Sequence, residues 1–263
     1  MAPSSISMGQ QVNDQAWDPR ARAARRIWLS YWRAMRHYHR FEVSGFEHIM
    51  RPGAALIVGY HGRAGAHDLC MLQSYMFERT GAMGSAVMHH AFARMPVLRW
   101  LVAGGGFVTS DGGDLAEAVG KGERLFVTPG GTREGYRSAR DRYRVDWGQR
   151  TGYLRLALKY GLPIIPTGAS GVDDTFIGLN DGYKWGKRLG APAGLPLWLG
   201  VGPLGLWPLS PPFPSKIRLR IGSPFQPTEL FADCNEPSEA VLLTAHARVA
   251  GAVQALLNSA RRA

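Results

Sequence analysis

The stretch AALIVGYHGRAGAHD, residues 54–68, determines how the rest of the chain is organised. Its first six residues are apolar, include β-branched side chains and follow Pro52-Gly53, so they predict a buried strand. The residues after Asp68, from Leu69 to Phe77, have the composition of a helix. A turn that joins such a strand to a helix faces the crevice of an α/β sheet. We therefore expect an α/β fold with functional side chains in this turn.

His61 and Asp68 are the candidate catalytic residues of the turn. On one continuous helix they would lie about 10 Å apart, which excludes a simple helical pair. If His61 lies in a loop and Asp68 in the first helical turn, Gly62 and Gly65 allow the chain to fold back. The carboxylate would then orient the imidazole, and an oriented imidazole is a general base near neutral pH. The alternative is a loop histidine and an acid favoured by the helix dipole.

Two further blocks follow in the sequence. Residues 125–134, LFVTPGGTRE, resemble the strand-Pro-Gly-Gly-x-Arg-Glu block of glycerolipid O-acyltransferases, in the branch related to diacylglycerol acyltransferases and plant phytyl-ester synthases. Residues 161–167, GLPIIPT, resemble an apolar block of the wider PlsC-like lysophospholipid acyltransferase superfamily. The three blocks stand in the family's order, and the resemblance extends from about Phe41 to about Pro227.

The resemblance implies an enzyme that moves a fatty acyl group from acyl-CoA or acyl carrier protein to a lipid hydroxyl, with no metal and no other cofactor. His61 would take the hydroxyl proton, Asp68 would hold the other imidazole nitrogen, and backbone N–H groups at the glycines would stabilise the oxyanion. The substrate-binding residues that it implies are Gly130, Gly131, Thr132, Arg133, Glu134 and Pro166.

The spacing of the turn departs from the family pattern. Six residues separate His61 from Asp68, more than in the phospholipid-making members, and this makes His67 a rival base. We prefer His61 because it follows the strand as the family's histidine does, whereas His67 adjoins Asp68, and adjacent helical side chains diverge by about 100°.

The residues expected at the acceptor site also depart from the family pattern. Phospholipid-making members carry an arginine where this chain has Ser110 and Asp111, and a glutamate where it has Gly130. Losing a cation that binds phosphate weakens binding by roughly 1–3 kcal/mol for each charged hydrogen bond. We therefore expect a neutral acceptor: a diacylglycerol, a monoacylglycerol or a long-chain alcohol. The alternative is a lysophosphatidic acid acyltransferase in which another arginine supplies the cation, from among Arg63, Arg94, Arg99 and Arg137.

Composition limits the class of protein. The 263 residues are 45% hydrophobic, which is enough for one α/β domain with a sizeable core. Two cysteines, Cys70 and Cys234, predict neither a disulfide framework nor a metal cluster. The first fifteen residues are polar and lack the apolar region of a secretory signal. We expect a peripheral protein on the cytoplasmic face of a membrane, and the sequence leaves the oligomeric state open.

The net charge of +11 has two interpretations, membrane binding and nucleic-acid binding. Residues 1–40 hold seven arginines against Asp14 and Asp18, a net +5, so nearly half of the excess lies in one arm. No nucleic-acid-binding motif accompanies this arm, whereas anionic lipid explains the charge equally well. We therefore expect membrane lipids as partners and no nucleic acid. A non-catalytic membrane- or nucleic-acid-binding protein on the same scaffold is the remaining alternative.

The basic arm predicts an amphipathic helix from about Trp17 to His39. Tryptophans and tyrosines fall on one face and most arginines on another, the pattern of a helix in a membrane interface. The alternative is a helix that packs its apolar face on the domain. We assign residues 1–40 to a disordered tail and this helix, and residues 41–263 to the acyltransferase domain.

Alternating strand and helix patterns from residue 54 to 167 predict a largely parallel central sheet flanked by helices. Residues 173–190 look like a loop. Residues 194–213 are apolar but contain five prolines, which exclude a regular transmembrane helix and favour an exposed apolar surface against the bilayer.

Overall fold

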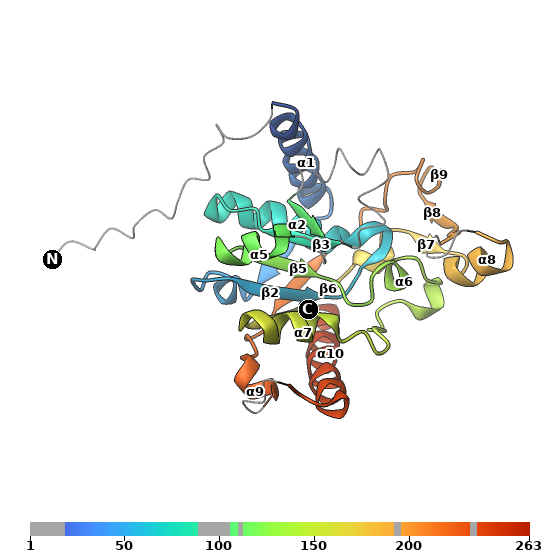
Figure 1. Cartoon of the computed structure of the whole chain (residues 1–263). Coiled ribbons are helices and arrows are strands. Elements are labelled where there is room, and N and C mark those ends of the chain that lie inside the picture. Colours follow the sequence, from blue (N-terminus) through green and yellow to red (C-terminus); the bar gives the residue numbers. More distant parts are fainter. Residues whose placement is uncertain (1–18, 89–105, 110–112, 192–195, 232–235) are drawn as a thin grey trace.

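The computed structural model describes residues 19–88, 106–109, 113–191, 196–231 and 236–263 (Figure 1). The strands are β1 (Glu42–Ser44), β2 (Ala55–Gly59), β3 (Ser85–Met88), β4 (Phe107–Thr109), β5 (Arg124–Val127), β6 (Ile164–Ser170), β7 (Ile177–Gly178), β8 (Gly200–Gly202), β9 (Gly205–Leu206) and β10 (Arg218–Ile221). The α-helices are α1 (Pro19–Tyr38), α2 (Arg63–Thr80), α5 (Gly113–Gly120), α6 (Thr132–Gly135), α7 (Gly152–Tyr160), α8 (Gly182–Arg188), α9 (Pro227–Phe231) and α10 (Glu239–Arg262). Short 3-10 turns are η2 (Phe46–His48), η3 (Ala139–Asp141) and η4 (Val172–Asp174).

The central sheet has seven strands in the order β1-β10-β6-β2-β5-β3-β4. From β6 to β4 every neighbouring pair is parallel, while β10 runs antiparallel to β6 and carries β1 on its outer edge. This confirms the expected α/β fold with a largely parallel sheet. A second, antiparallel sheet has the order β7-β8-β9.

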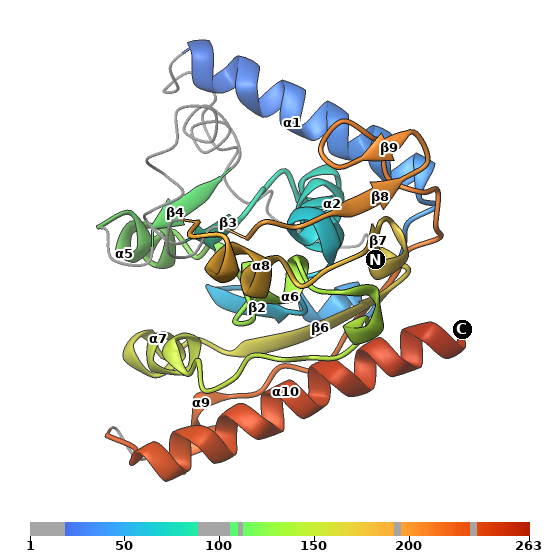
Figure 2. The same ribbon diagram turned by 90° about the vertical axis from the view of Figure 1, so that its right-hand side faces the viewer.

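Helices cover both faces of the central sheet (Figure 2). All five residues of β2 and all seven of β6 are buried, as expected of strands covered on both sides. α2 lies over one face, and α10 lies along β6 and β10 on the other. A Cβ added to Gly168 would come within 2.5 Å of the Leu257 backbone nitrogen, so glycine allows α10 to approach β6 closely.

α10 is long and apolar enough to cross a membrane, by length and composition alone. Its apolar residues Leu242, Val249, Val253 and Leu257 recur at helical spacing and are buried in the main hydrophobic core. This packing accounts for the apolar character of the helix within the domain.

The predicted N-terminal helix is present as α1, and it packs on α2. Trp32 is 5% exposed and belongs to the main core, and the indole N–H of Trp28 donates to Gln73 Oε1 at 3.0 Å. The Arg33 and Arg36 guanidinium groups both pair with Glu78 of α2. Part of the aromatic face is thus used inside the domain, while Ile27 and Tyr31 stay exposed. Residues 1–18, where we expect the disordered tail, lie outside the described residues.

Two expectations about the elements were wrong. Residues 173–190 are not a loop, because they contain η4, β7 and α8, and the Asp181 side chain caps α8 by accepting the backbone N–H groups of Tyr183 and Lys184. The second helix begins at Arg63, several residues before Leu69. Arg94, Arg99, Ser110, Asp111 and Cys234 lie outside the described residues.

Candidate functional site

His61 lies just past the carboxyl end of β2, on the loop that leads into α2. Its ring is buried, and burial lowers the pKa of the imidazole to about 4, so the ring is neutral at neutral pH. Nδ1 lies 3.2 Å from the Gly62 carbonyl oxygen. A Cβ added to Gly135 would lie 2.6 Å from Nδ1, so the ring packs directly on the backbone of α6. The histidine is therefore held between the first block and the glycine block.

Glu134 makes the link between these two blocks. Its carboxyl group accepts the His61 backbone N–H at 3.0 Å, the Trp147 indole N–H at 3.2 Å and the Asp146 backbone N–H at 2.8 Å. Burial raises the pKa of Glu134 to about 8, while the N–H donors act in the opposite direction. A Cβ added to Gly130 would lie 2.1 Å from the Glu134 carboxyl carbon. Gly130 is therefore the residue that leaves room for this carboxyl group.

Gly131 does not have the free N–H that the sequence suggested. Its φ of 54° lies in the left-handed region, and its N–H donates to the Thr128 carbonyl at 2.9 Å. The Gly131 N–H is used inside the turn, which corrects the expectation that this N–H stabilises an oxyanion.

The two residues after Gly131 bond to partners other than His61. The Thr132 hydroxyl bonds to the Tyr183 hydroxyl of α8. Arg133 is more than half exposed and pairs with Asp146 at 3.3 Å. Within the described chain, Arg133 is thus a surface cation placed next to the backbone segment that Glu134 binds.

Asp68 is buried in α2 but is not hydrogen-bonded to His61 in the structure. Its Oδ1 has no hydrogen-bond partner among the described residues, and burial raises its pKa to about 7. Gly65 and Ala66 have φ of 96° and 56°, so the first turn of α2 is irregular. These left-handed residues accommodate the extra spacing before Asp68. The catalytic role of Asp68 stays a prediction.

The rival base, His67, lies in an aromatic pocket. Its ring centroid is 5.1 Å from that of Trp32 and 6.5 Å from that of Phe176, both edge-on. Burial lowers the pKa of His67 to about 3, and Nδ1 has no hydrogen-bond partner within the described part of the chain. These contacts are those of a core histidine packed between α1 and the β7 region.

Sequence reasoning missed a buried polar cluster built on Tyr60 and Arg63, which flank His61. Arg63 donates to the carbonyl oxygens of Phe176 at 3.0 Å and Ser138 at 2.7 Å. The Tyr60 hydroxyl donates to Asp173 Oδ2 at 2.5 Å and accepts from Arg137, whose guanidinium also lies over the Tyr60 ring. The signal in the sequence was a tyrosine and an arginine flanking His61. We had considered Arg63 and Arg137 as phosphate ligands, but the structure uses both internally.

Pro166 is not brought together with His61. Pro166 and Leu256 of α10 both border Gly222, with Pro166 Cγ 3.0 Å from a Cβ added there, so Pro166 packs on the face of the sheet that α10 covers.

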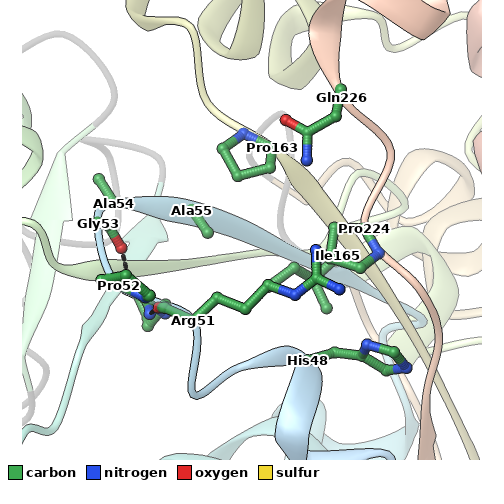
Figure 3. A pocket seen from close by; sticks show the side chains of 11 residues that line it. His48, Arg51, Pro52, Gly53, Ala54, Ala55, Pro163, Ile165, Pro224 and Gln226 are labelled. Atoms are coloured by element: carbon green, nitrogen blue, oxygen red, sulfur yellow. Dashed lines mark hydrogen bonds between the residues drawn. The ribbon is translucent and has the colours of Figure 1, made fainter.

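A small pocket opens at the amino ends of β2, β5 and β6, at the opposite ends of these strands from His61 (Figure 3). Arg124 in its lining donates to backbone carbonyls, including that of Ile49 at 2.8 Å, and therefore has a structural role. Among the described residues, no group of three or more histidines, cysteines or carboxylates is arranged to hold a metal ion.

Comparison with known proteins shows what the chain is similar to. A family model described as "Acyltransferase" matches residues 40–170. A Bos taurus protein described as "DGAT1/2-independent enzyme synthesizing storage lipids" is 25% identical over 248 residues, covering 92% of this chain and 69% of that protein. An uncharacterized Mycobacterium tuberculosis protein is 29% identical over 216 residues, covering 80% of this chain and 59% of that protein.

The fold has a counterpart in a crystal structure of the 1-acyl-sn-glycerophosphate (LPA) acyltransferase PlsC from Thermotoga maritima. The TM-score is 0.51 at 18% identity, covering 92% of this chain and 84% of the other. Together with the family match over the segment that holds His61 and Glu134, this places the chain in the PlsC-like acyltransferase superfamily, and it is an acyltransferase.

Proposed function

We propose that the enzyme transfers a fatty acyl group from a thioester to the hydroxyl of a neutral lipid. The observation that carries the proposal is the neutral, buried His61 at the carboxyl end of a central parallel strand, held through its backbone by Glu134. A neutral imidazole in this position is a general base that is ready at neutral pH.

The geometry favours one nitrogen of His61 as the base. The Gly62 carbonyl oxygen only accepts hydrogen bonds, so its contact with Nδ1 favours the tautomer with the proton on Nδ1 and the lone pair on Nε2. Nε2 takes the proton from the acceptor hydroxyl as its oxygen attacks the thioester carbonyl. The new C–O bond forms, the C–S bond breaks, and the imidazolium returns the proton to the departing thiolate.

The acyl donor in this proposal is a thioester carrier, either acyl-CoA or acyl carrier protein, with no other cofactor. The two donors differ in size and charge, so the same acyl chain presented on each carrier separates them. A much higher kcat/KM with one carrier identifies the donor.

Three observations support a neutral acceptor. Arg63 and Arg137 donate to internal carbonyl and hydroxyl oxygens, which leaves these two guanidinium groups engaged within the domain. The bovine relative is described as making storage lipids. Ser110 and Asp111 stand where a phosphate-binding arginine occurs in the phospholipid-making branch.

A competition experiment tests the acceptor. Purified protein receives one labelled acyl donor together with equal amounts of diacylglycerol and lysophosphatidic acid, and the labelled products are separated. We expect triacylglycerol as the main product. A clear preference for lysophosphatidic acid would instead assign a lysophospholipid acyltransferase, in which another arginine binds the phosphate. Formation of neither product, with hydrolysis of the donor, would contradict the proposed transfer.

We also propose that the enzyme acts as a peripheral protein on the cytoplasmic face of a membrane. The expected acceptor is a lipid that partitions into a bilayer, and the basic arm of residues 1–40 matches an anionic leaflet. Fractionation of cells into soluble and membrane pools, followed by a high-salt wash, tests this location, because a peripheral protein held by charge is released by salt.

A further inference from the structure

Exposed apolar side chains concentrate on the small sheet and α8. Of the fourteen large apolar side chains that are exposed in the described residues, nine lie between Ile177 and Leu209. The most prominent are Leu179, Trp185, Leu189, Leu204, Leu206 and Leu209. Leu204 is 81% exposed and Leu209 is 93% exposed. We call the surface formed by β7, β8, β9 and α8 the 177–209 face. A concentration of this kind marks an interaction surface.

The sequence around Trp198 shows why this surface is unusual. Trp198 is 6% exposed and packs on Phe176, while its neighbours Leu197 and Leu199 are 37% and 41% exposed on the opposite side. A sheet with one face in water alternates apolar and polar residues. The segment Leu197–Leu199, just before β8, is apolar on both sides, so its outer side is suited to a second apolar medium.

The framework under the face is well hydrogen-bonded. Asn180 donates to the Leu197 carbonyl at 2.8 Å and accepts the Leu199 N–H at 2.7 Å. The Leu179 N–H donates to the Leu199 carbonyl at 2.9 Å. The leucines at 179, 197 and 199 therefore extend from backbone that is fixed by hydrogen bonds.

The charge of α8 indicates what kind of partner would cover the 177–209 face. The helix has the sequence GYKWGKR, with three cations and no acid within it. Lys184 is exposed and makes one long contact of 3.7 Å with Asp181, and Trp185 beside it is about half exposed. Basic and tryptophan residues next to leucines are characteristic of the headgroup region of a bilayer that contains anionic lipid.

The 177–209 face is hydrogen-bonded to the segments that surround His61. Arg63, two residues after His61, donates to the carbonyl of Phe176 at the start of β7. Thr132 of the glycine block bonds to Tyr183 of α8. In Figures 1 and 2, α8 and the small sheet lie on the same side of the molecule as α6, toward which β2 points. A bilayer on this face would therefore border the His61 side of the central sheet.

We propose that the 177–209 face docks on a bilayer containing anionic lipid, with its leucines in the acyl boundary and the α8 cations at the headgroups. This assignment concerns binding and does not depend on which acyl acceptor the enzyme uses. It differs from the expectation for α1, because α1 uses much of its aromatic face on α2.

The first test uses the full chain and a matched control. Leu204→Glu/Leu209→Glu places two charges on the face, and Met50→Glu places one on an exposed apolar residue before β2, outside the face. Cosedimentation is measured with vesicles of phosphatidylcholine and phosphatidylglycerol. We expect the double variant to lose about tenfold or more of its vesicle partitioning, since buried leucine contributes strongly to insertion, and Met50→Glu to stay within about twofold. Unchanged binding of the double variant, or an equal loss in Met50→Glu, would overturn the proposal.

A second test examines the charges. Lys184→Gln/Lys187→Gln should weaken binding to the anionic vesicles and reduce its salt dependence, with no effect on vesicles of phosphatidylcholine alone. Light scattering measures the oligomeric state, because a second copy of the chain could also occupy the face. A wild-type dimer that Leu204→Glu/Leu209→Glu converts to monomer would assign the face to dimerisation and contradict the proposal. Acyl transfer between water-soluble short-chain substrates should be unchanged in every variant, which separates a failure of docking from a failure of catalysis.

Discussion

At the scale of single residues, the candidate site is organised by the carboxyl group of Glu134, which the sequence places in the glycine block of residues 125–134. Glu134 accepts the backbone N–H of His61. The Glu134 carboxyl group occupies the space that a side chain at position 130 would need, so this position requires glycine. The resemblance identified the block, but a sequence pattern does not show that its glutamate contacts the backbone of His61. That contact depends on parallel pairing of β2 with β5, which brings residues far apart in the sequence to adjacent strand ends.

Glu134→Gln tests this positioning role. The amide keeps the shape of the side chain but has one acceptor oxygen, so its NH₂ group would face at least one of the N–H donors. We expect kcat to fall by about 10- to 100-fold with KM changed little, because the base is displaced while substrate contacts remain. Glu229→Gln on α9, where the carboxylate is exposed, is the control. Wild-type kcat in Glu134→Gln would show that the contact is only structural.

The two histidines near the turn give a second prediction at this scale. His61→Ala should abolish turnover, whereas His67→Ala should cost less than about tenfold, or roughly 1.4 kcal/mol in activation free energy. The reason is that His61 follows β2 beside the glycine block, while His67 packs between Trp32 and Phe176. Circular dichroism of both variants confirms that they are folded. If the two losses came out in reverse order, His67 would be the base.

At the scale of elements, hydrophobic periodicity and composition predicted β2, the N-terminal helix α1 and the alternation of strands and helices from residue 54 to 167. Those segments have strong apolar patterns that local packing and tertiary packing both favour. The start of α2 could not be predicted from the sequence, because a glycine at position 65 normally indicates a loop. In the structure Gly65 and Ala66 adopt left-handed conformations inside the first turn of the helix. α8 was missed because it is short and its tryptophan faces outward, so it has no apolar face pointing to the core.

The docking of α1 on α2 was the alternative that the sequence left open, and it leads to a stability prediction. Trp32→Ala should lower the free energy of unfolding by roughly 3 to 5 kcal/mol, because a large core side chain is removed and leaves a cavity. Trp185→Ala on α8 is the matched control, since that indole is about half exposed, and it should cost below about 1 kcal/mol. Urea unfolding followed by circular dichroism measures both. Equal losses would mean that α1 does not stabilise the domain.

At the scale of the whole molecule, four buried ionisable groups in and near the turn after β2 form two opposing sets. Burial lowers the pKa of His61 to about 4 and of His67 to about 3, from 6.5, and raises the pKa of Asp68 to about 7 from 3.8 and of Glu134 to about 8 from 4.5. The histidines favour folding above their unfolded pKa and lose that contribution as pH falls. The carboxyl groups favour folding below their unfolded pKa and lose that contribution as pH rises through the folded value.

Adding these groups predicts the pH dependence of stability. Between about pH 5 and 6 the unfolded chain binds about two more protons on these histidines and the native protein about two more on these carboxyl groups, so the combined contribution of the four groups to stability is nearly flat. Between about pH 7 and 8 only the carboxyl excess remains, so the free energy of unfolding should fall by roughly 1 kcal/mol as pH rises. Urea unfolding across this range measures it. Asp68→Asn removes one carboxyl contribution, so stability should then rise with pH over the range that is flat in the wild type. A steady rise in wild-type stability up to pH 8 would show that these carboxyl groups are ionised in the native protein.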